Sequence, residues 1–120
     1  MKSMLIIDGS PSIARLFAEI FERRGWSVST CGDRDCAIER LAGSEPYDVV
    51  LSYRVPGTDG VQLIRFIRAP EHRRTTAVVM VTGSRDVKVK EDAFAAGADE
   101  ILFKPVNPNA LAWAIDKHSS

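Results

Sequence analysis

The chain has 120 residues, which is enough for one hydrophobic core but not for two, so we expect a single domain over residues 1–120. Lysine and arginine number 16 and aspartate and glutamate number 16, and this zero net charge argues against nucleic acid or an anionic membrane as the main partner. No apolar run approaches the ~20 residues that cross a bilayer, and no signal-peptide pattern precedes the first strand-like segment. We therefore expect a cytoplasmic protein.

Strand-like and helix-like segments alternate five times along the chain, which predicts a parallel sheet covered by helices. Short apolar runs predict strands at residues 3–8, 26–31, 77–82 and 100–103, and at residues 47–52 or 47–53. Apolar residues at helical spacing predict helices at residues 11–24, 33–42, 59–69, 86–96 and from 108 onward. The first of these helices is expected to bury one stripe, formed by Ile13, Leu16, Phe17, Ile20 and Phe21. We expect residues 117–120 to form a tail or the start of a linker.

Two sets of side chains outside the strand ends have more than one interpretation. Cys31 and Cys36 lack the spacing of metal ligands, so we expect buried reduced thiols, with a redox pair as the alternative. A basic cluster follows the third predicted helix, where cations suit a helix C-terminus, and we expect a solvated surface, with a docking site for an acidic partner as the alternative. This cluster consists of Arg65, Arg68, His72, Arg73 and Arg74.

Four polar residues end predicted strands: Asp8, Ser52, Thr82 and Lys104. Ser52 comes directly before a Pro/Gly-containing turn at residues 55–60, which places it at the end of its strand. Parallel strands bring their carboxyl ends to one edge of the sheet, where open α/β folds place their chemistry. We therefore expect these four side chains to lie around one crevice.

Five short motifs occur in a characteristic order and spacing. They are Leu5-Ile6-Ile7-Asp8, Val55-Pro56-Gly57-Thr58-Asp59-Gly60, Val79-Met80-Val81-Thr82-Gly83, Ala96-Gly97-Ala98-Asp99 and Phe103-Lys104-Pro105. Together they resemble the receiver domain of two-component response regulators, of the chemotaxis-regulator type, over essentially the whole chain. The resemblance implies a flavodoxin-like (βα)5 fold, a doubly wound parallel sheet with strand order 2-1-3-4-5.

In that family two acids end the first strand, and an aspartate ending the third strand accepts a phosphoryl group from a histidine kinase, with Mg²⁺ bound by the three carboxylates. The resemblance assigns Asp8 to the first acid. It assigns Thr82 and Lys104 to the hydroxyl and the lysine that hold the phosphoryl oxygens. Gly9 stands at the position of the second acid and Ser52 at the position of the phosphoacceptor.

The loss of two carboxylates changes the expected chemistry. With Gly9 and Ser52 in place of acids, we expect Mg²⁺ binding to be absent or very weak, no other cofactor, and no enzymatic activity. Asp8 and Lys104 are expected to form a structural ion pair, and Arg54 lies close enough in sequence to bind Asp8 with two nitrogens. Phosphorylation of Ser52 is the alternative, although a serine needs a general base and the sequence supplies no obvious one.

The switch of the family is also altered. Ile101 stands where the family usually has an aromatic side chain that moves inward together with the hydroxyl at the position of Thr82. Isoleucine is stiff at χ1 and has no ring to rotate. We therefore expect no phosphate-driven rearrangement.

These observations predict an atypical receiver that acts as a phosphorylation-independent protein-interaction module. We expect its partner to be another protein, for example a histidine kinase or an output domain, or a second copy of the chain. The partner should bind the face formed by helix 86–96, strand 100–103 and the last helix. That face should include Val87, Lys90, Glu91, Ile101, Ala114 and Lys117, with Trp113 at its margin. A small haloacid-dehalogenase-like phosphohydrolase is a further alternative, suggested by Asp8-Gly9-Ser10 but lacking the second loop aspartate.

Overall fold

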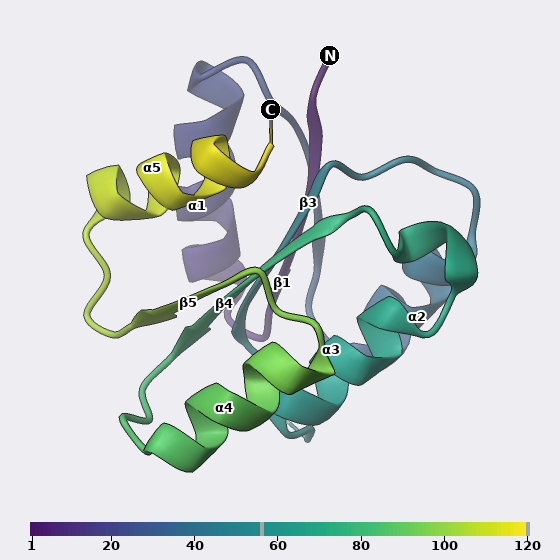
Figure 1. Cartoon of the computed structure of the whole chain (residues 1–120). Helices are drawn as coiled ribbons and strands as arrows, with labels where there is room; N and C mark the ends of the chain where they lie inside the picture. Colours follow the sequence, from purple (N-terminus) through teal and green to yellow (C-terminus); the bar gives the residue numbers. More distant parts are fainter. Residues whose placement is uncertain (56, 120) are drawn as a thin grey trace.

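The computed structural model describes residues 1–55 and 57–119, apart from the side chain of residue 54. Five strands form one parallel sheet in the order β2-β1-β3-β4-β5 (Figure 1). The strands are β1 (Ser3–Asp8), β2 (Ser27–Cys31), β3 (Val49–Arg54), β4 (Ala77–Thr82) and β5 (Glu100–Phe103). The fold expected from the sequence is confirmed.

One α-helix follows each strand, and their bounds lie within two residues of the predicted ones. They are α1 (Pro11–Arg23), α2 (Arg34–Ala42), α3 (Gly60–Arg68), α4 (Val87–Ala96) and α5 (Pro108–His118), with a short 3-10 helix at Glu71–Arg73. Each α-helix begins after a side chain that accepts a hydrogen bond from the first turn, which satisfies one otherwise unpaired N–H group. These capping residues are Ser10, Asp33, Asp59, Asp86 and Asn107.

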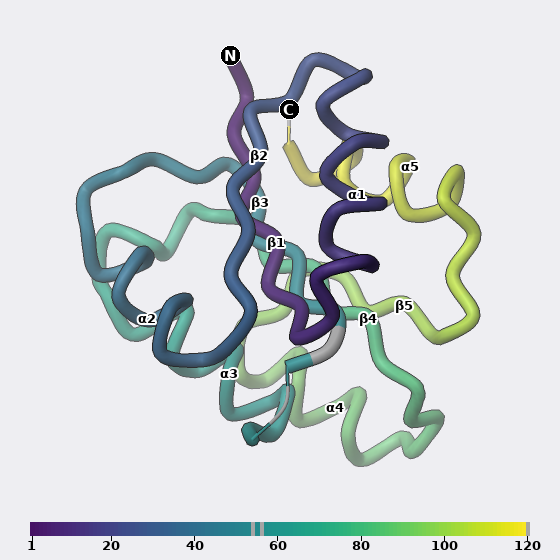
Figure 2. The backbone as a smooth tube through the Cα atoms, turned by 180° about the vertical axis from the view of Figure 1, so that it is seen from behind, coloured from purple at the N-terminus to yellow at the C-terminus, as the bar shows by residue number. Residues whose placement is uncertain are grey.

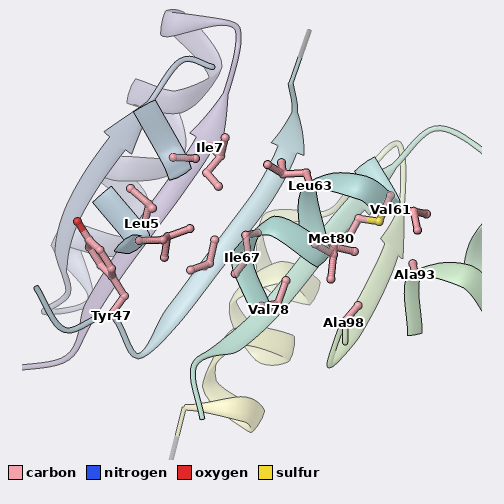
Figure 3. Close-up of a cluster of buried hydrophobic side chains, with 14 of the residues drawn as sticks. Leu5, Ile7, Tyr47, Val61, Leu63, Ile67, Val78, Met80, Ala93 and Ala98 are labelled. Carbon is pink, nitrogen blue, oxygen red and sulfur yellow. The ribbon is translucent and has the colours of Figure 1, made fainter. Parts of the chain in front are cut away.

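The helices cover both faces of the sheet, with α1 and α5 on one side and α2, α3 and α4 on the other (Figures 1 and 2). Successive strand residues point to opposite faces, so each strand contributes to two hydrophobic clusters. Leu5 and Ile7 belong to the cluster under α2, α3 and α4 (Figure 3), whereas Met4 and Ile6 belong to the cluster under α1 and α5. Because of this alternation, two side chains at the strand ends can contact each other only if they point to the same face of the sheet.

Three local expectations differ from the structure. Cys31 and Cys36 are joined in a disulfide rather than reduced, because the chain turns from the end of β2 into the first turn of α2 and brings their Cα atoms to 5.6 Å. Leu16, expected in the buried stripe of α1, is 53% exposed. Helix α5 continues through His118, which leaves residues 117 and 118 helical rather than part of a tail.

Two members of the basic cluster after α3, Arg68 and Arg73, are internal hydrogen-bond donors, whereas Arg65, His72 and Arg74 are exposed as expected for a solvated surface. Arg73 is 3% exposed and donates to the carbonyl oxygens of Leu41, Gly43 and Glu45 at 2.9, 3.0 and 2.6 Å. Arg68 donates to several backbone carbonyls, including that of Gly97. Buried carbonyls need such partners, so the two arginines tie loops together.

No helix in the described part of the chain has the length and apolar character that crossing a bilayer requires.

Candidate functional site at the strand ends

Ser52 lies at the carboxyl end of the sheet, between β1 and β4. It pairs with Ile7 of β1 and Met80 of β4 in the parallel register. Its side chain is 4% exposed, and no hydrogen bond between described residues involves its hydroxyl. Because Val50 belongs to the cluster under α2, α3 and α4, the two-residue repeat directs Ser52 to the same side.

Thr82 and Lys104 join Ser52 around a cavity of about 220 Å³ at this edge. Thr58 and Gly60 close the side formed by the β3–α3 turn, and Gly83 borders the cavity at the end of β4. The sequence correctly placed Ser52, Thr82 and Lys104 at one crevice. The Thr82 hydroxyl accepts a hydrogen bond from the Ser84 amide at 3.1 Å, so its own proton remains available for donation.

Asp8 lies on the other side of the sheet edge. It follows Met4 and Ile6 in the repeat, both under α1 and α5. The β1–β3 register shifts between Ile7 and Asp8, which is a β-bulge. Asp8 is 1% exposed, accepts a hydrogen bond from the Ser10 amide at 2.9 Å, and lines a separate cavity of about 350 Å³ between α1 and β2. The single crevice expected from the sequence is therefore two cavities.

Lys104 contacts an aromatic ring rather than a carboxylate. Its Nζ lies 4.4 Å from the ring centroid of Tyr53, and that ring is 5.0 Å from the ring of Phe17. Within the described residues, the ion pairs do not include the expected Asp8–Lys104 pair, because Asp8 faces the α1 side of the bulge. Cation–π contacts of this kind contribute about 0.5–2 kcal/mol, depending on exposure. The side chain of Arg54, expected near Asp8, lies outside the described part of the structure.

The donor set does not fit a magnesium ion. Mg²⁺ requires near-octahedral oxygen ligands at ~2.1 Å and usually one or two carboxylates in contact with water. Here Asp8 is the acid at these strand ends, its side chain is buried, and Gly9 and Ser52 supply no carboxylate. We therefore assign no chemical step to a metal.

The α4–β5–α5 face differs from the sequence expectation in two residues. Val87 and Trp113 are both 65% exposed, and Lys90, Glu91 and Lys117 are also exposed. Ile101 and Ala114, however, are 7% and 1% exposed, because Ile101 packs in the cluster under α2, α3 and α4 and Ala114 faces the sheet. These two residues supply no surface to the face.

Phe94 is a residue of this face that the sequence reasoning missed. It is 42% exposed and lies seven residues after Val87, two helical turns along the same side of α4. Lys90 and Glu91 lie between them at three and four residues from Val87. The i, i+3, i+4, i+7 spacing was the available signal, but in a helix it usually marks the buried side.

Helix α5 carries a small ion-pair network at the margin of this face. Lys117 Nζ lies 4.6 Å from the Trp113 ring centroid and 2.9 Å from Glu100, which also pairs with His118 at 2.9 Å. Burial raises the pKa of Glu100, but the hydrogen bonds from His118 and Lys117 outweigh it, so that this pKa is lowered from 4.5. His118 is therefore part of this network.

The parallel sheet order 2-1-3-4-5 with helices on both faces defines an α/β domain of the flavodoxin-like type. The response regulator receiver domain family matches residues 4–116, so the chain belongs to that family, whose members act in two-component signalling. The chain is 31% identical over 112 residues to the transcriptional regulatory protein ResD of Bacillus subtilis and 33% identical over 110 residues to the nitrogen assimilation regulatory protein NtrX of Azorhizobium caulinodans. These matches cover 93% and 90% of the chain but only 45% and 24% of ResD and NtrX, so the chain spans less than half the length of either relative.

Solved structures agree with the family assignment. The chemotaxis response regulator CheY4 of Vibrio cholerae superposes with a TM-score of 0.89 at 25% identity, covering 98% of both chains. Receiver domains are signalling modules rather than typical enzymes. The haloacid-dehalogenase alternative gains no support, since Ser10 acts as the helix cap of α1, its hydroxyl accepting from the Ile13 amide at 3.4 Å.

Proposed function

We propose that this domain acts as an atypical receiver, whose protein binding does not depend on phosphorylation. The observation that carries the proposal is Ser52, a buried hydroxyl at the position where the family has its phosphoacceptor aspartate. An alcohol at this position attacks phosphorus only when a base removes its proton. Within the described residues that line its cavity, neither a carboxylate nor a histidine is present to do so.

Incubation with acetyl phosphate and Mg²⁺, followed by intact-protein mass spectrometry, tests this proposal. The wild-type chain should gain no phosphoryl group. The double variant Gly9→Asp/Ser52→Asp is the positive control, because it supplies a carboxylate at the two strand-end positions where the family has them. A phosphorylated wild-type chain that loses the modification in Ser52→Ala would instead establish Ser52 as an unconventional acceptor.

The output surface that we propose consists of Val87, Lys90, Glu91, Phe94, Trp113 and Lys117. Exposed apolar side chains beside charges are typical of reversible protein interfaces. In such interfaces a few Trp, Tyr and Arg side chains contribute much of the binding free energy. A cytoplasmic histidine kinase, an output domain or a second copy of the chain remains the expected partner. No residue of this surface lies near Ser52 in the sequence.

Self-association offers a direct test of this surface, because it needs no identified partner. Sedimentation equilibrium of the wild-type chain should be compared with Trp113→Ser and with Leu16→Ser, a matched control that removes an exposed apolar side chain from α1. If pairing occurs, Trp113→Ser should weaken it and Leu16→Ser should not. Pairing that Leu16→Ser abolishes would assign the interface to another face.

A further inference from the structure

The Cys31–Cys36 disulfide joins the end of an edge strand to the first turn of a helix. Cys31 is the last residue of β2, at the edge of the sheet, and Cys36 is the third residue of α2. Cys31 is 3% exposed, while the other residues of β2 are partly or fully exposed. In reducing compartments such as the cytoplasm, where we expect this chain, disulfides are rare and those that form are usually transient or redox-sensing. The bond therefore calls for a reversible role.

Helix α2 depends on this bond at its first turn. The helix has 9 residues, fewer than the ~12–15 that an isolated helix needs in water, and its buried side chains are Ala37 and Leu41. Arg73 holds the C-terminal end by donating to the Leu41 carbonyl at 2.9 Å. At the first turn, the Asp33 carboxylate accepts from the Cys36 amide at 2.8 Å, and the disulfide supplies the covalent link to the sheet. The two ends are thus anchored separately, and cleavage of the disulfide loosens the first turn alone.

The two cysteines differ in their access to solvent. Cys36 is half-buried and borders a surface cavity of about 600 Å³ together with Glu39, Arg40 and Gly43. This volume lies in the roughly 300–1,000 Å³ range of pockets that hold small molecules. Cys31 is almost fully buried at the end of β2. An external thiol therefore reaches the disulfide from the side of Cys36.

We propose that Cys31 and Cys36 form a thiol–disulfide exchange site, which releases the first turn of α2 when thiols reduce it. An external thiolate attacks the Cys36 sulfur, the bond to Cys31 breaks, and Cys31 leaves as a thiolate that takes up a proton. A second thiol group of the reductant then attacks the reductant's own sulfur in this mixed disulfide, and Cys36 leaves and is protonated in turn. The reductant loses two electrons and two protons and becomes a disulfide, and the chain gains them as two thiols.

The effect of reduction should spread from α2 to its neighbours without unfolding the domain. Arg34, in the same first turn, lies over the Phe66 ring of α3, with 5.7 Å between the guanidinium carbon and the ring centroid. Arg34 also borders a small cavity with Gly57 of the β3–α3 turn. The disulfide closes a loop with a sequence separation of only five residues, and short loops contribute less to global stability than long ones. This redox input goes beyond the proposed protein-binding function and does not depend on it.

Hydrogen exchange measured by NMR on the whole oxidised and reduced domain tests the release of α2. The reporter is the Ala37 amide, which donates to the Asp33 carbonyl at 3.2 Å. The control is the Leu111 amide, which occupies the equivalent position of α5 and donates to the Asn107 carbonyl at 3.0 Å. Reduction should accelerate exchange about tenfold or more at Ala37 and leave Leu111 unchanged. Equal acceleration at both amides, or none at Ala37, would overturn the proposal.

Reduced glutathione and dithiothreitol, used separately without denaturant, test the exchange chemistry with a small monothiol and a dithiol. Alkylation of the products followed by intact-protein mass spectrometry counts the thiols. Two alkylated thiols in a chain that keeps its far-UV circular dichroism support the site, whichever reductant produces them. Reduction that needs urea with both reagents would identify a permanent structural cross-link and overturn it.

A matched pair of variants tests the assignment of Cys36 as the sulfur that is attacked. Cys31→Ala leaves Cys36 as the free thiol, and Cys36→Ala leaves Cys31. With oxidised glutathione, the Cys31→Ala chain should form a mixed disulfide about tenfold faster or more, because its thiol is the accessible one. Equal rates, or a faster reaction of Cys36→Ala, would contradict the assignment. The measurements on the wild-type chain decide the proposal even if one variant does not fold.

Discussion

Replacing Arg73 with methionine should destabilise the domain far more than the same replacement at its neighbour Arg74. Arg73 is 3% exposed and donates hydrogen bonds to the carbonyls of Leu41, Gly43 and Glu45, while its guanidinium carbon lies 5.2 Å from the Tyr47 ring centroid. Arg74 is exposed. The two positions therefore have the same side chain in opposite environments.

The expected loss follows from these contacts. The bond to Leu41 is buried, and a buried acceptor left without a partner costs about 1–3 kcal/mol. The bonds to Gly43 and Glu45 are part-buried, so water replaces them and each loss costs about 0.5–1.5 kcal/mol. The contact with Tyr47 adds about 1 kcal/mol, and the apolar methionine side chain regains part of the total. We expect a loss of about 3 kcal/mol for Arg73→Met and less than about 0.5 kcal/mol for Arg74→Met.

Urea unfolding followed by far-UV circular dichroism measures both values, since the midpoint falls in proportion to the stability lost when the slope stays constant. Arg73→Lys is an informative third variant, because a lysine retains the charge but lacks the planar fork that reaches three carbonyls. Equal midpoints for Arg73→Met and Arg74→Met would refute the structural role of Arg73. The basic cluster would then again be a candidate docking surface.

Three further substitutions test other parts of the structure. Gly97→Ala should lower the free energy of unfolding in urea by about 2 kcal/mol or more, because Gly97 has φ +119° and an added Cβ would lie 2.8 Å from Arg68 Cγ. Gly32→Ala is the control and should cost little, because a Cβ added at Gly32 meets nothing within 4 Å. Ile101→Asp should unfold or strongly destabilise the domain, by about 3 kcal/mol or more, because Ile101 is 7% exposed and packs in the core. The pKa of Glu100 is lower in the folded state than its ordinary value of 4.5 in the unfolded state. Ionised Glu100 therefore stabilises the fold above pH 4.5, and this stabilisation is lost as the pH falls through the lower pKa of the folded state. Glu100→Gln should therefore flatten the loss of stability on acidification, and an unchanged acid profile would contradict the network with Lys117 and His118.

The fold could be predicted from the sequence because its signals are local and agree with one another. The apolar run at 77–82 gives β4 with the same bounds, and the side chains of Ser10 and Asn107 cap helices that begin with proline. The exposed Leu16 shows the limit of this reasoning, since it belongs to the same apolar stripe of α1 as Phe17 and Phe21, which are buried, and is nevertheless 53% exposed. Periodicity indicates which side of a helix faces the sheet, but not where the contact ends.

The sequence placed the candidate residues at the strand ends, but it did not show that they line two separate cavities. Ser52, Thr82 and Lys104 meet as expected from parallel strand ends. Asp8 does not line their cavity, because it follows Met4 and Ile6 in the two-residue repeat of β1 and so faces the α1 side of the sheet. The alternation along β1 is readable in the sequence, but the expectation of a single crevice considered only that all four residues end strands. Long-range partners such as the three carbonyls of Arg73 were also out of reach, since they come from residues 28 to 32 positions earlier.

In an atypical receiver of the kind that we propose, Lys104 needs a partner other than a phosphoacceptor carboxylate. Removing one charge of a buried pair strongly destabilises the fold unless the remaining charge finds another partner. Here Lys104 lies on the ring of Tyr53, which itself packs on Phe17 of α1, so the lysine is held by the layer on the Asp8 side while its ammonium group borders the Ser52 cavity. In the atypical receiver that we propose, the aromatic residue after Ser52 would take over part of the electrostatic role of an acceptor aspartate. Tyr53→Leu should accordingly release Lys104, and an unchanged environment of the Lys104 side chain in NMR spectra of that variant would contradict this account.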